Sequence, residues 1–101
     1  MAQPRIEIPL DKIEAFCRKW RIREFSLFGS VLTDEFRPDS DVDVLVDYET
    51  EARWDLWDHL HAEQELGELL GRAVDLVEKR AVTNPFRRRH ILENREVIYA
   101  A

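Results

Sequence analysis

The sequence predicts an α/β fold of the α+β type, in which a small mixed β-sheet packs against helices. Apolar residues in the N-terminal part of the chain recur at three- and four-residue spacing, as on one face of a helix. Short β-branched runs separate this segment from further helical segments. The chain has 101 residues, of which 45% are hydrophobic and 10% aromatic, enough for one modest core. We therefore expect a single domain over residues 1–101.

The N-terminal half is predicted to contain a helix, a strand, a short helical turn and a loop, over residues 10–20, 23–28, 31–36 and 37–40. Pro9 and Asp11 suit the start of the helix, and Gly29-Ser30 interrupts the chain after the strand. The apolar face of the helix consists of Leu10, Ile13, Phe16, Cys17 and Trp20.

The C-terminal half is predicted to alternate strands and helices: a strand over 42–46, a helix over 51–70, a strand over 73–77, a helix over 82–94, and a strand or tail over 96–99. Gly71 is expected to end the long helix. Its apolar residues are expected in the core or at a partner interface: Trp54, Trp57, Leu60, Leu66, Leu69 and Leu70.

Charge excludes some functions. The formal net charge is -6, from 15 basic and 21 acidic residues, which argues against DNA coating, direct nucleic-acid binding or an anionic-membrane role. Metal ions can still bridge acidic residues to a nucleotide. The single cysteine cannot form an internal disulfide. No apolar stretch approaches the ~20 residues that span a bilayer, and no signal peptide is visible. We expect a cytoplasmic protein.

Two acidic residues at the start of the second strand carry the main chemical signal. Side chains alternate along a strand, so Asp41 and Asp43 point to one face and Val42 points to the other. Two nearby ionised carboxylates repel each other, and a divalent cation with oxygen ligands, such as Mg²⁺, removes that repulsion. The pair therefore predicts a metal site, although a solvated strand end or a helix cap would also place aspartates here.

Two further elements fit the same chemistry. Gly29 lets the backbone approach a phosphate closely, and Ser30 can donate a hydrogen bond to it or cap a helix. Asp75 lies among apolar residues of the third strand, where an unpaired carboxylate is costly. It could share a metal with the aspartate pair, accept a proton from an attacking hydroxyl, or pair with Arg72. Together these residues predict phosphoryl or nucleotidyl transfer.

The stretch GSVLTDEFRPDSDVDVLVDYE resembles the minimal nucleotidyltransferases of the DNA polymerase β superfamily. Their signature is Gly-Ser, a spacer, and Ser-Asp-x-Asp followed by apolar residues; a third carboxylate lies on a later strand. The matching positions are Gly29, Ser30, Ser40, Asp41, Asp43 and Asp75. The resemblance extends from about Phe25 to Tyr99, through the ending NPFRRRHILENREVIYA.

The resemblance implies a polymerase β-like fold, two Mg²⁺ ions and an NTP substrate, usually ATP. It assigns Asp41, Asp43 and Asp75 to the metals and to catalysis, and Gly29 and Ser30 to the nucleotide. Ser40 is either a nucleotide contact or a turn residue. Small members resemble the antitoxins of HEPN/MNT toxin–antitoxin pairs, which transfer AMP to a tyrosine of a HEPN ribonuclease. We therefore expect a HEPN partner and a hetero-oligomer.

One departure leaves an alternative open. Where many family members carry an arginine and a glycine after Gly-Ser, this chain has Thr33 and Asp34. Asp34 adds negative charge near the phosphates, so a weak or inactive antitoxin that acts by stoichiometric binding is the alternative. An aminoglycoside nucleotidyltransferase ranks lower, because the chain has no room for a second substrate domain. The basic run 87–90 is expected to be a solvated helix face or a contact to a partner or phosphate.

Overall fold

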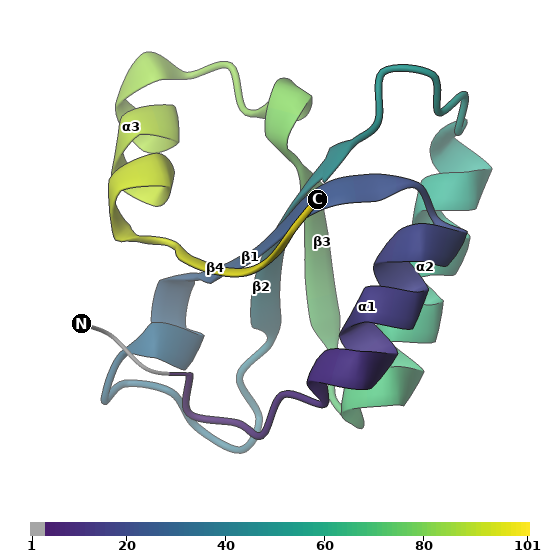
Figure 1. Cartoon of the computed structure of the whole chain (residues 1–101). Helices are drawn as coiled ribbons and strands as arrows, with labels where there is room; N and C mark the ends of the chain where they lie inside the picture. The colour runs from purple at the N-terminus through teal and green to yellow at the C-terminus, as the bar shows by residue number, and fades with distance from the viewer. Residues whose placement is uncertain (1–3) are drawn as a thin grey trace.

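The computed structural model describes residues 4–101, so the first three residues of the predicted domain lie outside the described part. Within the described residues, three α-helices, four strands and two short 3₁₀ turns follow one another (Figure 1). Their order is α1 (Leu10–Lys19), β1 (Ile22–Phe28), η1 (Gly29–Leu32), β2 (Val42–Tyr48), α2 (Leu56–Leu70), β3 (Val74–Glu78), η2 (Lys79–Ala81), α3 (Pro85–Asn94) and β4 (Glu96–Ala100).

The strands form one four-stranded sheet in the order β3-β2-β1-β4. β1 pairs antiparallel with both β2 and β4, whereas β2 and β3 are parallel and α2 connects them. This arrangement confirms the predicted small mixed sheet packed with helices. The C-terminal segment, predicted as a strand or a tail, is an edge strand of the sheet.

The helices divide between the two faces of the sheet. Figure 1 shows α1 and α2 on one face and α3 on the other. The face under α1 and α2 holds the main core, because alternate residues of β2 point into it. The buried members of that core are Ile13, Phe16, Cys17, Ile22, Phe25, Leu27, Val31, Leu32, Val42, Val44, Val46, Tyr48, Ala62, Leu66 and Leu76.

The face under α3 is packed more thinly. Its buried apolar cluster consists only of Phe28, Leu45, Val82 and Ile91. Much of this face of the sheet is therefore left to polar side chains.

Asn84 caps the start of α3, since its side-chain carbonyl accepts hydrogen bonds from the N–H groups of Phe86 and Arg87.

The predicted start of the long helix at residue 51 is wrong, because α2 begins at Leu56. Asp55 is extended and caps the helix: its carboxylate accepts the N–H of Asp58, and the Asp58 carboxylate accepts the N–H of Asp55. Such a reciprocal pair fixes the first turn and leaves residues 51–54 outside it. Gly71 ends the helix as predicted, in the left-handed conformation at φ +68°.

The apolar side chains of α2 divide between the core and the surface. Leu66 is buried and Leu69 and Leu70 pack against the core, but the first helical turns point outward. Leu56 and Trp57 are each 69% exposed, and Leu60 is 41% exposed. Leu56, Trp57 and Leu60 therefore lie on the surface of the protein and not in its core.

No helix within residues 4–101 is long and apolar enough to cross a membrane.

Candidate functional site

The turn after β1 brings Gly29 against Asp43. Phe28, the last residue of β1, is paired across the sheet with Asp43 of β2, so the next residue lies beside this carboxylate. Gly29 has φ +77°, a conformation that L-residues with side chains rarely adopt. A Cβ at this position would lie under 3.0 Å from Asp43 Oδ2 and 3.3 Å from its Cγ. The glycine is therefore required here both by its backbone and by the carboxylate that fills its space.

The two acidic strands are in register. Asp43 of β2 pairs directly with Asp75 of β3, and the flanking residues Val42 and Leu76 are buried on the opposite face. Strand alternation thus places both carboxylates on the face that α3 partly covers. Asp41 lies just before β2, is exposed, and shares this face by the same alternation. Gly29, Asp43 and Asp75 thus lie together in the fold, and Asp41 lies just before the same strand as Asp43.

The surroundings of the Asp43 carboxyl disfavour its ionisation. Burial raises the pKa of the Asp43 carboxyl above its ordinary value, and the negative charges of Asp75 and then Asp41 raise it further. The positive charge of Arg87, on α3, opposes the shift. A carboxylate whose ionisation is disfavoured by two neighbouring carboxylates is stabilised by a cation in their midst.

The carboxylate oxygens of the three aspartates suit Mg²⁺ as ligands, although the side chains do not converge on one point in the structure. Within residues 4–101, no three His, Cys, Asp or Glu side chains stand together in a ready-made metal-binding cluster. The three aspartates nonetheless offer only oxygen atoms, and Mg²⁺ prefers oxygen ligands, taking some from protein carboxylates and the rest from phosphates and water. The residues present therefore suit a metal that arrives with a nucleotide.

The two serines of the predicted site have different surroundings. Ser30 lies within η1, where Phe28 takes the cap position and no side chain caps the turn, so the cap role is not seen. Its carbonyl accepts hydrogen bonds from the Thr33 N–H at 2.8 Å and hydroxyl at 2.9 Å. Ser40 is a turn residue: its Oγ accepts the N–H of Arg37 at 3.0 Å. That leaves the Ser40 hydroxyl proton available to a ligand.

A cleft of about 470 Å³ opens beside the glycine turn. One wall is formed by η1 and the loop after it, including Gly29 and Ser30; the other is formed by His90 and Asn94 of α3. Residues Glu35, His90 and Asn94 were not among the predicted site residues. The spacing of His90 and Asn94 places them on one helix face, but only the fold shows that this face meets the glycine turn.

Arg72 and Asp34 have partners other than the site aspartates. Arg72 does not form an ion pair with Asp75; its guanidinium donates to the carbonyls of Arg37 and Pro38 at 2.9 and 2.8 Å. Asp34 forms an ion pair with Arg5. The negative charge of Asp34, which follows Thr33 at the position of the family's arginine, is thus partly compensated.

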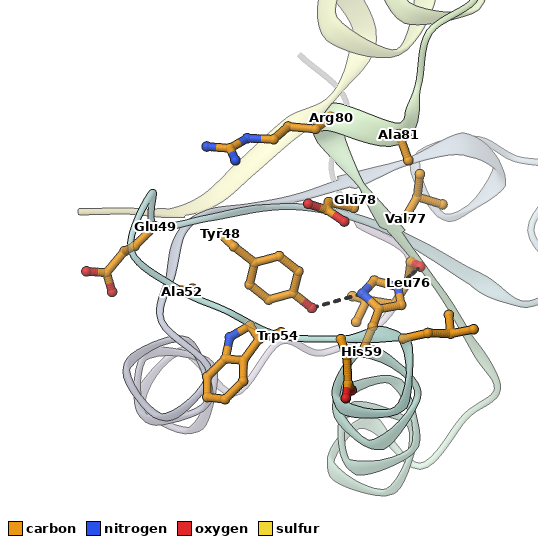
Figure 2. A pocket seen from close by; sticks show the side chains of 12 residues that line it. Tyr48, Glu49, Ala52, Trp54, His59, Leu76, Val77, Glu78, Arg80 and Ala81 are labelled. Carbon is orange, nitrogen blue, oxygen red and sulfur yellow. Dashed lines mark hydrogen bonds between the residues drawn. The ribbon is translucent and has the colours of Figure 1, made fainter.

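A second, larger cavity of about 510 Å³ lies at the opposite end of β2 and β3, and Figure 2 shows the side chains that line it. Tyr48 is five positions beyond Asp43 on β2, or ~17 Å along a strand, so this cavity is separate from the aspartates. His59 uses both ring nitrogens here, with the Tyr48 hydroxyl at 3.0 Å and the Leu76 carbonyl at 2.8 Å. It is a structural histidine with both ring nitrogens satisfied.

Comparison with known proteins agrees with this geometry. The family model for the nucleotidyltransferase domain matches residues 11–98. Protein adenylyltransferase MntA of Thermococcus cleftensis is 37% identical over 81 residues, which cover 80% of this chain and 77% of that protein. A solved structure described as a minimal nucleotidyltransferase is 33% identical, with a TM-score of 0.70 and 86% of each chain covered.

A third relative shows the same fold in a complex. It is the MNT antitoxin bound to the tri-AMPylated HEPN toxin of Shewanella oneidensis, with 21% identity and a TM-score of 0.67. The match covers 91% of this chain and 70% of that one. The family match, the related sequences and the placement of the aspartates beside the glycine turn lead to one conclusion: this chain belongs to the nucleotidyltransferase domain family, among its minimal members, and is a nucleotidyltransferase.

Proposed function

We propose that this protein transfers AMP from ATP to a tyrosine hydroxyl of a HEPN-type ribonuclease toxin and thereby acts as its antitoxin in the cytoplasm. The observation that carries the proposal is the register of Asp43 with Asp75 beside Gly29, with Asp41 on the same face. The names of the Thermococcus cleftensis and Shewanella oneidensis relatives support the transferred group and the partner.

Each site residue has a role in this reaction. The tyrosine oxygen forms a bond to the α-phosphorus of ATP, the bond from that phosphorus to the β-phosphate oxygen breaks, and pyrophosphate leaves. Asp75 accepts the tyrosine proton. Gly29 lets the backbone approach the phosphates, and Ser30 and Ser40 donate hydrogen bonds to the nucleotide. Two Mg²⁺ ions held by Asp41, Asp43 and Asp75 would neutralise the charge on the triphosphate.

The surface also supports a protein partner. Leu56, Trp57 and Leu60 form an exposed apolar patch on the first turns of α2, and Trp54 adjoins them at 37% exposure. Large apolar side chains gathered on one surface mark interaction sites in proteins, and tryptophan is enriched among residues that dominate binding energy. We propose that the toxin covers this patch in a hetero-oligomer.

Intact-mass analysis tests the proposal. The chain is co-expressed with a HEPN-type protein from the same genome, and the purified pair is incubated with ATP and Mg²⁺. We expect the toxin to gain the mass of one or more AMP groups, on tyrosine by peptide mapping. The gain should be absent for the Asp41→Asn, Asp43→Asn double variant. An unchanged gain in that variant would remove these aspartates from the reaction.

A second candidate function is neutralisation by binding alone. It is favoured by Thr33 and Asp34, which stand where an arginine and a glycine are frequent in related proteins. Tight binding to the toxin without a mass change, equal for the wild type and for the double aspartate variant, would support this candidate and exclude the transfer reaction.

A further inference from the structure

The three consecutive arginines of α3 have different environments. Arg88 is half-buried, and its guanidinium donates to the carbonyls of Lys79 and Val82 at 2.8 and 3.2 Å, which ties α3 to η2. Arg89 is exposed and forms an ion pair with Glu93, one turn further along the helix, at 2.8 Å. Arg87 is exposed, and its side chain has neither a hydrogen bond nor an ion pair within residues 4–101. Of the three, Arg87 alone has its charge uncommitted.

Helix geometry points Arg87 toward the glycine turn. Residues three and seven positions apart share a helix face, so Arg87 lies on the face of His90 and Asn94, one turn nearer the start of α3. His90 and Asn94 form the wall of the cleft opposite Gly29 and Ser30. Arg87 therefore extends this wall by one helical turn toward the start of α3, next to the residues that line the cleft.

The charge balance of the site calls for a cation in this position. Asp41, Asp43 and Asp75 bring three negative charges to one face of the sheet, and the triphosphate of a nucleotide brings several more. Bound Mg²⁺ compensates for part of this charge, and phosphate oxygens that face away from the metal need other donors. An arginine offers a planar fork of N–H donors that matches two phosphate oxygens at once.

We propose that Arg87 binds the triphosphate of the nucleotide, from the α3 side of the cleft between η1 and α3. This inference rests on the proposed nucleotide-transfer function and assigns it a residue outside the aspartate and glycine motif. It makes α3 a wall of the nucleotide site, with Arg88 fixing the helix and Arg87 contacting the ligand. Arg89, on a different face of the same helix, has no part in binding.

Isothermal titration of the purified protein with ATP and Mg²⁺ tests the assignment, with AMP as a second probe. The Arg87→Ala variant is expected to bind ATP about 10- to 100-fold more weakly, the usual worth of charge-assisted hydrogen bonds. Its affinity for AMP should fall less, because AMP lacks the β- and γ-phosphates. Arg89→Ala is the matched control, two residues away and also exposed, and should bind ATP as the wild type does.

A lysine at position 87 separates charge from geometry. Arg87→Lys should retain part of the ATP affinity, since a point charge remains but the bidentate fork is lost. Equal ATP affinities for Arg87→Ala, Arg89→Ala and the wild type would overturn the role of Arg87 and leave the nucleotidyl-transfer proposal standing. A wild-type protein that binds no ATP in the presence of Mg²⁺ would overturn both.

Discussion

The two faces of the sheet differ in the side chains that the same strands place on them: one face is apolar and closed, the other carries carboxylates. Under α1 and α2, β2 contributes Val42, Val44 and Val46 to a closed apolar core. On the other face, the same strand presents Asp43 opposite Asp75, over which α3 closes only a small apolar cluster. Strand alternation makes this division possible, because neighbouring residues of one strand belong to different environments.

The difference indicates where stability and chemistry reside. Burial of large apolar side chains is the dominant favourable term in folding, and it is concentrated on the α1 and α2 face. The α3 face instead holds Asp43, whose carboxyl pKa is raised first by burial and then by the negative charges of Asp75 and Asp41. The molecule can keep this unfavourable arrangement because the opposite face stabilises the sheet. Substitutions on the two faces should therefore have separable effects.

The largest effect is expected on activity, from the polar face. Asp43→Asn should lower AMP transfer more than about 100-fold, because even partners that only orient metal ligands are worth about 10- to 100-fold. Its melting temperature should not fall, since a source of repulsion is removed. The measurement is a transfer assay on the HEPN toxin beside thermal unfolding by circular dichroism. Equal loss of activity and stability would mean that Asp43 belongs to the fold.

The matching change on the apolar face is Leu66→Ala. Leu66 is completely buried on the core side of α2, so the cavity should lower the free energy of unfolding by about 2–5 kcal/mol. Transfer activity should be normal at temperatures where the variant remains folded. Urea unfolding gives the free energy, and the activity assay on the same sample gives the comparison. A selective loss of activity without loss of stability would break the division between the faces.

For the polar face, the sequence predicted more about which residues take part than about how the strands bring them together. The Gly-Ser and Asp-x-Asp spacing predicted Gly29, Asp41 and Asp43 as site residues from positions close in the chain. The pairing of Phe28 with Asp43 across β1 and β2 is what brings Gly29 against this carboxylate. The direct register of Asp43 with Asp75 was not predictable, because it depends on the path of α2 between the parallel strands.

Other features required the tertiary structure or a closer look at local capping. Asp47 is a charged residue that is buried in the structure, and its carboxylate accepts a hydrogen bond from Arg23 Nε at 2.8 Å. The pairing of β1 with β2 creates that contact, and no local pattern signals it. The start of α2 was predictable in principle, since Asp55 and Asp58 have capping-box spacing. The run of arginines gave no indication of which one faces the site.

Gly29 lies at the boundary of the polar face, and Gly29→Ala sharpens the comparison. The new Cβ would displace the Asp43 carboxylate, and the left-handed backbone adds about 1–2 kcal/mol of strain. We expect a modest drop in the melting temperature and a loss of transfer close to that of Asp43→Asn. Gly71→Ala is the matched control: it has a similar φ of +68° and no atom within 4 Å of the added Cβ. It should lose stability but keep activity.

The pH dependence of stability gives a smaller, signed effect. Burial, Asp75 and Asp41 raise the folded-state pKa of Asp43 above 3.8, so protonation favours the folded state and ionisation opposes it. The wild type should lose stability relative to Asp43→Asn as the pH rises through about 4 toward the raised pKa. The pH-dependent part of the difference should vanish below about pH 3, where Asp43 is protonated in both states. Paired thermal melts in metal-free buffer measure it, and a constant difference at every pH would show that the pKa of Asp43 is not raised in the folded state.

The smallest effect on the fold is expected at the exposed end of α2. Trp57→Ser should change the free energy of unfolding by no more than about 0.5 kcal/mol, because the side chain is largely in water. If the toxin covers the apolar patch, its affinity should nevertheless fall at least about tenfold. Leu10→Ser is the control, since Leu10 is 63% exposed on α1, outside the patch. Titration calorimetry with the catalytically inactive Asp43→Asn background separates binding from transfer, and equal affinities for the two serine variants would place the toxin on another surface.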